Sequence, residues 1–401
     1  MKKTKIYMKI LLGAAVFLTP TYLIRFDVMG IPTNMWELLL GAIFLMWLKE
    51  DFSKKKLKIW WEDVKKNQYF FPITLILVGT TVSTLAAKDM EASLGIVKGW
   101  FVMPLLLALV IAKKIKINKD REWILSAMVL SATIVAVIAI TYYMYGYLTY
   151  DGRLRAFWES PNHLAMYLAP GSILSFWNVF LKNNKKEKIW KVVLWSGAFA
   201  LIATSIYLTK SYATWMAIFV SVGVMGYLKH KKNKTALLQG AAVLIFAIGI
   251  IFVFQIQQDK FTQLIKFEER SSLSSRIMIW KASTKIIQDN WFFGIGPGNF
   301  QASYLEYQKH FPPYLEWAVP QPHNLFLAFW LQSGLVGLVG FLWLLLVWTK
   351  SVLKKIKGDA NNHIPYFLLG IMVYFLIHGL VDTTYWKNDL AIMFWTVFVL
   401  I

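Results

Sequence analysis

The chain has 401 residues, of which 57% are hydrophobic, and its mean hydropathy is +0.49. The apolar residues fall into runs of about 17–25 residues, the length that crosses roughly 30 Å of hydrocarbon. The composition therefore predicts an all-α polytopic membrane protein and excludes an ordinary soluble domain. The chain has no cysteine, which excludes disulfides, thiolate metal sites and cysteine nucleophiles.

The formal net charge of +21 would suggest a nucleic-acid partner in a soluble protein. In this chain the lysines sit in short connections between apolar runs, where the positive-inside rule places them. The expected partner is therefore the lipid bilayer, with no nucleic acid.

The apolar runs predict about twelve spans. The first is not interpreted as a cleaved signal peptide, because no small-x-small site follows it. The last is weak, because it contains Lys387, Asn388 and Asp389. The predicted spans are Lys9–Ile24, Ile31–Leu48, Phe70–Ala87, Leu94–Ala112, Trp123–Tyr147, His163–Leu181, Ile189–Leu208, Ser211–Leu228, Thr235–Gln255, Asn324–Thr349, Ile364–Val381 and Thr383–Ile401.

The distribution of Lys and Arg predicts the orientation in the membrane. The N-terminus and alternate loops hold 29 of the 43, so that side is expected to be cytoplasmic. Both termini are then inside, and the long segment Ile256–Pro322 faces outward. A loop of this length usually carries function. No period of 20–50 residues and no inverted pair of broken helices is found in the sequence.

Within the outer segment, one face of a predicted helix is apolar at helical spacing. Arg276 lies at the edge of this face, and Lys281 and Lys285 lie on the opposite side. Such a helix would lie along the outer membrane surface, and an interfacial helix with snorkelling cations remains the alternative to a functional one. The expected apolar face comprises Leu273, Ile277, Trp280, Thr284 and Ile287.

A glycine-rich turn and a histidine follow this helix. Gly294, Gly296 and Gly298 demand a special backbone path, which suits a structural turn or the approach of N–H groups to phosphate. It is not a Walker A loop, since no Lys-Ser/Thr follows. His323 opens the tenth span and could act as a base or as an interfacial residue.

By topology, several charged and titratable residues fall on one membrane face. Together they describe a site for a multiply charged anion, such as a pyrophosphate, with a base beside it. These residues are Arg153, Arg155, Lys210, Arg276, His323, His378 and Asp382.

The spacing of these elements resembles the signature region of the bacterial O-antigen ligase and O-antigen polymerase superfamily. The resemblance runs from about Asp151 to Trp395, and it suggests a division into N-terminal transmembrane helices (1–150) and an O-antigen ligase-related region (151–401) with its loop at 256–322. The family often has Ser-Arg where this chain has Ser211-Tyr212; either Lys210 supplies that charge or the charge is absent in this chain. The matching elements are Gly152-Arg-x-Arg-x-Phe, Pro161-Asn162-x-Leu-Ala165, Arg276-x-x-x-Trp280, Phe293-Gly-Ile-Gly-Pro-Gly-Asn-Phe300, His323-Asn324-Leu-Phe-Leu, Gly334-x-x-Gly337 and His378-x-x-x-Asp382.

The resemblance implies a GT-C-like membrane glycosyltransferase of the bacterial cytoplasmic membrane with an extracytoplasmic site. The donor would be a saccharide on undecaprenyl pyrophosphate, and the acceptor a glycan or another envelope molecule. Family members are described as metal-independent, and the sequence has no carboxylate pair or His/Asp cluster at metal-ligand spacing. No cofactor is expected, and direct displacement would invert the anomeric carbon.

Each candidate residue then has an expected role. Guanidinium groups must stabilise the pyrophosphate leaving group in the absence of a metal. His323 would accept the proton of the acceptor hydroxyl, and His378 with Asp382 would form a supporting or alternative base pair if their helix persists that far. The pyrophosphate would bind Arg276 with Arg153 or Arg155 and Lys210, and the positioning residues would be Asn162, Gly294, Gly296, Gly298 and Asn324.

Two other classes of function are compatible with a basic polytopic protein. A flippase or exporter of lipid-linked oligosaccharides would need charges deep in several spans and internal pseudo-symmetry. A non-catalytic partner of an envelope-synthesis complex would make Arg276 and His323 dispensable. High Lys and Ile usage is typical of a low-GC genome, as in many Gram-positive bacteria, which have no lipopolysaccharide to ligate. It therefore favours a polymerase or transferase of capsular, teichuronic or similar glycans over a ligase of lipopolysaccharide.

Overall fold

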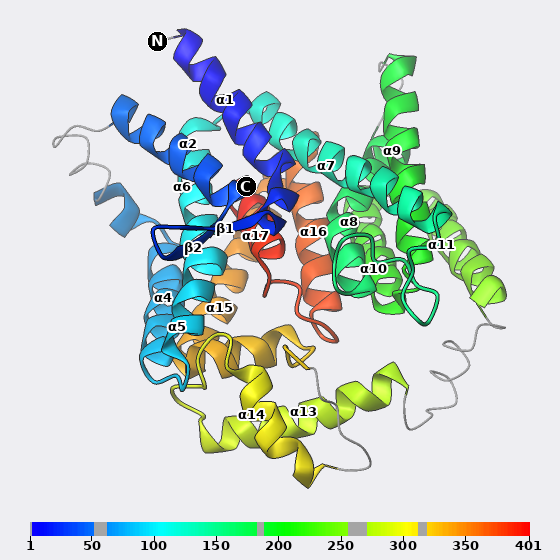
Figure 1. The fold of residues 1–401 in the computed structure, drawn as a ribbon. Helices are drawn as coiled ribbons and strands as arrows, with labels where there is room; N and C mark the ends of the chain where they lie inside the picture. Colours follow the sequence, from blue (N-terminus) through cyan, green and yellow to red (C-terminus); the bar gives the residue numbers. More distant parts are fainter. Residues whose placement is uncertain (1, 52–61, 183–187, 256–270, 312–318) are drawn as a thin grey trace.

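The computed structural model describes residues 2–51, 62–182, 188–255, 271–311 and 319–401, and most of them are helical (Figure 1). A short antiparallel hairpin of β1 (Arg25–Val28) and β2 (Ile31–Asn34) interrupts the N-terminal helices. The helices are α1 (Lys2–Phe17), α2 (Met35–Asp51), α4 (Phe70–Leu85), α5 (Met90–Val97), α6 (Met103–Lys114), α7 (Asn118–Met144), α8 (Pro161–Phe176), α9 (Ile189–Leu208), α10 (Tyr212–His230), α11 (Lys234–Gln255), α13 (Ser272–Asp289), α14 (Phe300–Tyr307), α15 (Leu325–Gly358), α16 (Ile364–His378) and α17 (Asn388–Val399).

Every predicted span coincides with a helix in the described residues. Five helices are long and apolar enough to cross a membrane, which confirms an all-α membrane protein of multi-pass type. Two of the five continue through a π-helical turn, α5 into α6 through Lys98–Val102 and α8 through Trp177–Leu181. The other described helices do not meet both the length and the hydropathy expected of a span, so the count of twelve spans stays a prediction. The predicted loop 256–322 lies partly outside the described residues.

Several predicted span ends differ from the structure. The second predicted span begins in strand β2, and its helix, α2, starts only at Met35. The first helix ends at Phe17, and a 3-10 turn that contains Pro20 follows it, because proline cannot continue an α-helix. Near the C-terminus, α16 ends at His378 and α17 begins only at Asn388. The stretch 379–387 between them is non-helical, and α17 is buried over almost its whole length.

The closest helix pair, α4 and α15, meets through glycine. A Cβ on Gly79 would lie 2.3 Å from the amide nitrogen of Gly337, so only glycine permits this approach of the two backbones. Earlier in α15, Gly334 has non-helical angles (φ 66°, ψ −177°) and divides the helix into two parts. This break lets the first part of α15 leave the direction of the second and carry its N-terminus toward α16.

The glycine-rich turn after α13 packs into the same region. All three glycines have positive φ, and a Cβ on Gly294 would lie 2.4 Å from the carbonyl oxygen of Leu331. The N–H of Ile295 donates to that carbonyl, and the N–H of Gly298 donates to the Gln332 side chain. These contacts are those of a structural turn that seats the α13–α14 unit on α15.

Helices α13 and α14 cover the end of the bundle opposite the N-terminus of the chain (Figure 1). The apolar face predicted for α13 is only partly right: Ile287 is buried as predicted, but the face that packs inward is a neighbouring one, with Ile279, Ala282 and Ile286 buried against α14 and α15. Ile277 and Thr284 are exposed instead. Packing against other segments causes this difference, because α13 buries one face against α14 and α15 and directs a second face at the polar network described below.

Candidate functional site

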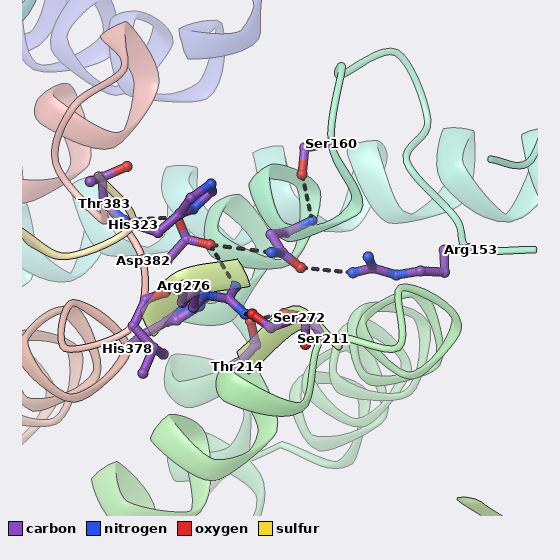
Figure 2. A network of polar contacts seen from close by, with 12 residues as sticks. Arg153, Ser160, Ser211, Thr214, Ser272, Arg276, His323, His378, Asp382 and Thr383 are labelled. Atoms are coloured by element: carbon purple, nitrogen blue, oxygen red, sulfur yellow. Dashed lines mark hydrogen bonds and ion pairs between the residues drawn. The ribbon is translucent and has the colours of Figure 1, made fainter. Parts of the chain in front are cut away.

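The carboxylate of Asp382 is the centre of a polar network at this end of the bundle. Its Oδ1 accepts hydrogen bonds from Nδ1 of His323 at 3.0 Å and from the N–H of Thr383 at 2.9 Å. Its Oδ2 accepts from Asn162 at 3.2 Å and lies 3.6 Å from Nη2 of Arg276. Figure 2 shows Asp382 between His323 and Arg276. One buried side chain thus joins residues that are far apart in the sequence.

The pKa of Asp382 lies well below its usual range. Burial alone would raise this pKa, but the neighbouring His323, its hydrogen bond and the guanidinium of Arg276 together outweigh that effect. The carboxyl is therefore ionised at neutral pH. An ionised carboxylate of this kind fixes the proton of the His323 imidazole on Nδ1.

His323 is held in an unusual backbone conformation just before α15. Its φ of +46° is rare for a residue other than glycine, and such strain persists only where the surroundings impose it. Its carbonyl accepts from the indole of Trp280, and the next residue, Asn324, caps α15 and donates to Leu380. The imidazole is 32% exposed, so its Nε2 is accessible while Nδ1 is bound to Asp382.

Arg276 is positioned by two backbone carbonyls. Its Nε donates to Val381 at 2.6 Å and its Nη1 to Ser272 at 3.1 Å. Arg276 and Trp280 are four positions apart on α13, so they share the helix face that contacts the network. The guanidinium is largely buried, with 14% of the side chain exposed.

Arg153 reaches the network through Asn162 (Figure 2). Its Nη2 donates to Oδ1 of Asn162 at 2.7 Å and its Nε to the carbonyl of Thr209 at 2.8 Å. Burial lowers the pKa of this guanidinium, and Asp151, 3.8 Å away, acts in the opposite direction. A bound anion would offset the desolvation of such a charge.

The helix termini add to the positive potential. Asn162 lies in the first turn of α8, Arg276 bonds the first residue of α13, and Asn324 caps α15. Helix α10 begins three residues after Thr209, which accepts the hydrogen bond of Arg153. The N-terminal ends of helices carry partial positive charge and free N–H groups, which favour anions.

The structure separates the other predicted residues from this network or places them at its edge. Arg155 is exposed, and Lys210 sits in the tight turn before α10 with a φ of +49°. His378 is buried and bonds the hydroxyl of Tyr374 at 2.7 Å. The predicted helix face shared by His378 and Asp382 does not exist, because α16 ends at His378, and Asp382 bonds His323 instead.

The network also contains groups that sequence reasoning missed. Backbone carbonyls of Thr209, Val381 and Ser272 hold the two guanidinium groups, and a carbonyl leaves no residue-type signal in a sequence. A second His–Asp pair, His163 with Asp389, was also missed. Its signal was available: a charged residue inside an apolar helix needs a partner. In the described part of the chain, no three His, Asp or Glu side chains gather as a metal-binding group.

Comparison with known proteins shows similarity to O-antigen ligases. The family described as O-antigen ligase matches residues 197–342, which include Lys210, Arg276, the glycine-rich turn and His323. The O-antigen ligase of Salmonella typhimurium strain LT2 is 22% identical to this chain over 338 residues, which cover 78% of each protein. Both similarities support the resemblance of the chain to the O-antigen ligase and O-antigen polymerase superfamily. Three members of the network, Arg153, Asn162 and Asp382, lie outside the range that matches the O-antigen ligase family, and the tertiary structure brings them to its residues.

Proposed function

We propose that this protein is an inverting membrane glycosyltransferase that moves a saccharide from an undecaprenyl-pyrophosphate donor to a glycan or envelope acceptor. The observation that carries the proposal is the His323–Asp382–Arg276 cluster. It combines an accessible imidazole nitrogen, a carboxylate that orients the imidazole, and a guanidinium close to both.

Each group has a chemical role in the proposed transfer. Nε2 of His323 takes the proton of the acceptor hydroxyl as the acceptor oxygen attacks the anomeric carbon. The bond from that carbon to the phosphate oxygen breaks, and the electron pair leaves with the pyrophosphate. Arg276 and Arg153, with Lys210 at the edge, stabilise the developing negative charge. No step of the proposed transfer requires a metal ion.

An apolar groove supports a lipid-linked donor. It has a volume of about 810 Å³ and lies between α8, α9, α10 and α11. At one end it is lined by Ile206 and Tyr207, which directly precede the turn whose Thr209 carbonyl holds Arg153. A donor with its pyrophosphate at Arg153 could extend its hydrocarbon chain along this groove.

The proposed topology has twelve spans, both termini in the cytoplasm and the network on the outer face of the bacterial cytoplasmic membrane. Because the chain has no cysteine, single-cysteine variants can test it. Lys281→Cys on α13 should react with an impermeant maleimide in intact cells, and Lys232→Cys, in the turn after α10, only after lysis. The opposite labelling pattern would contradict the outward placement of the site.

The decisive test of the enzyme is an assay with purified protein, lipid-linked saccharide donor and acceptor glycan. His323→Ala should lower kcat by about 10²–10⁴-fold, the usual contribution of a general base. His310→Ala, which removes an exposed histidine of the same outer segment, is the matched control. Full activity of the His323→Ala variant would contradict its role as the base, and absence of transfer by the original protein would support a flippase or a non-catalytic partner. The product of the assay distinguishes a polymerase from a ligase. A polymerase, the alternative favoured above for capsular glycans, lengthens the chain of glycan repeats.

A further inference from the structure

Two carboxylates lie in or beside the non-helical stretch 379–387 that connects α16 and α17. Asp382 lies inside this stretch and belongs to the network of the proposed active site. Asp389 lies just past its end, as the second residue of α17. Each is paired with a histidine from another helix or helix end: Asp382 with His323, and Asp389 with His163 of α8.

The two pairs differ in how the imidazole is used. His163 places its Nε2 3.0 and 2.9 Å from the two oxygens of Asp389, and the side chains are only 7% and 0% exposed. His323 bonds through Nδ1 and leaves Nε2 accessible. A buried carboxylate is tolerated only when it is paired, and Asp389 also accepts a hydrogen bond from the N–H of Leu390. The His163–Asp389 pair, called the inner pair below, is closed to substrate, whereas the His323–Asp382 pair is open to it.

The inner pair joins the two chain segments that meet again at Asp382. His163 directly follows Asn162, whose side chain bonds both Arg153 and Asp382. Asp389 follows the stretch that carries Val381 and Asp382, which together bind Arg276. Trp158 packs on the His163 ring with centroids 5.3 Å apart and fixes its orientation. The position of His163 against Asp389 therefore sets how the start of α8 faces the 379–387 stretch.

We infer that His163 and Asp389 form a positioning pair for the proposed glycosyl transfer. The pair holds the 379–387 stretch in register with the N-terminus of α8, so that Asp382 reaches His323, Arg276 and Asn162 together. His163 does not touch substrate, and its effect on the reaction passes through Asp382. This inference rests on the proposed function for its kinetic readout and on the geometry alone for its structural one.

The kinetic test compares two substitutions at His163 in nanodiscs. The amide nitrogen of His163→Gln can still donate to Asp389, whereas His163→Leu has no donor. His163→Leu should lower kcat by about 10–100-fold, the cost of a small misplacement of catalytic groups. KM for the saccharide donor should stay within about twofold of the original value, because the substitution removes no contact with that substrate. His163→Gln should recover most of kcat.

A double-mutant cycle separates positioning from general loss of structure. His163→Leu combined with Asp382→Asn should be little worse than Asp382→Asn alone, because both act through the same carboxylate. The control is Tyr167→Phe, which removes a buried 2.6 Å hydrogen bond to Ser131 one turn further along α8 and should leave kcat unchanged. Unchanged kcat in His163→Leu, or an effect that multiplies with that of Asp382→Asn, would overturn the inference.

Hydrogen exchange provides a readout that does not depend on activity. Amides of 379–387 should exchange faster in His163→Leu than in the original protein, and His163→Gln should restore their protection. If the original protein transfers no saccharide, the proposed function fails, and the exchange result still decides whether the pair positions this stretch. Equal exchange in all three proteins would overturn the pair's positioning role.

Discussion

His323 and Asp382 lie 59 positions apart in the chain and share a hydrogen bond of 3.0 Å between Nδ1 and Oδ1. The bond directs the proton of a neutral imidazole to Nδ1 and leaves the lone pair of Nε2 at the accessible side. The same carboxylate contacts Arg276, so the imidazole and this guanidinium share one buried partner. The proposed base and the proposed leaving-group stabiliser are thereby fixed relative to each other.

Replacing Arg276 by lysine should not preserve activity. The planar guanidinium reaches the carbonyls of Val381 and Ser272 and the carboxylate of Asp382 at once, and a single ammonium group cannot satisfy the three. We expect Arg276→Lys to lower kcat by about 10²-fold or more, as for loss of a transition-state donor. The measurement is steady-state transfer with a lipid-linked donor.

Lys281→Ala is the matched control for Arg276, since Lys281 is exposed on the same helix away from the network. Its kcat should equal that of the original protein. Near-normal turnover by Arg276→Lys would mean that a positive charge alone is sufficient at this position.

The depressed pKa of Asp382 predicts a pH-dependent contribution to stability. Because the folded-state pKa lies below the unfolded one, the contribution is fully present above about pH 4 and declines as the pH falls below the unfolded value. Asp382→Asn leaves Arg276 without its countercharge, which should cost about 3 kcal/mol at pH 7. Thermal unfolding in detergent should show that the difference in Tm between the original protein and Asp382→Asn is largest at pH 7 and becomes smaller at lower pH. A gap of constant size would mean that the carboxylate is not an ionised partner in the folded protein.

Filling the apolar groove should affect long-chain donors selectively. Gly226 lines this groove and a Cβ there would meet nothing within 4 Å, so Gly226→Phe can be accommodated without a backbone clash. We expect a KM about tenfold higher for the full-length polyprenyl donor and little change for a short-chain analogue. The comparison of the two donors is the measurement.

Gly197→Phe is the control for that substitution. Gly197 also has open space around it, but it lines a different cavity, between α7 and α9. A similar rise in KM in both variants, or equal effects on short and long donors, would place the lipid chain elsewhere.

The break in α15 should depend on glycine. A Cβ on Gly334 would lie 2.4 Å from the carbonyl oxygen of Phe292, and the φ of +66° is unfavourable for alanine. Gly334→Ala should lower Tm and expression, with a cost of about 1–3 kcal/mol from the backbone strain alone. Gly95→Ala, where nothing lies within 4 Å, should leave Tm unchanged or slightly raised. Equal Tm values for the two variants would show that the break does not require glycine.

The sequence by itself determined the helical membrane class, the approximate place of each apolar helix and the resemblance to the O-antigen ligase and polymerase superfamily. Hydrophobic length is a local property, because every backbone group in lipid must be bonded within its own helix. The residue types of the anion site were also accessible, since Arg153, Arg276 and His323 fall on one predicted face. Motif spacing of Arg276, the glycine-rich turn and His323 carried the family resemblance.

Only the tertiary structure decided which of those residues act together. Local spacing favoured His378 as the partner of Asp382, but α16 ends at His378 and the turn after it presents the carboxylate to His323 instead. Contacts between distant segments likewise determine which face of α13 packs inward. They also determine that Arg153 joins the network while Arg155 is exposed. A periodic pattern records which side chains share a face, but the partners of that face are set by long-range packing and by buried charges that must be paired.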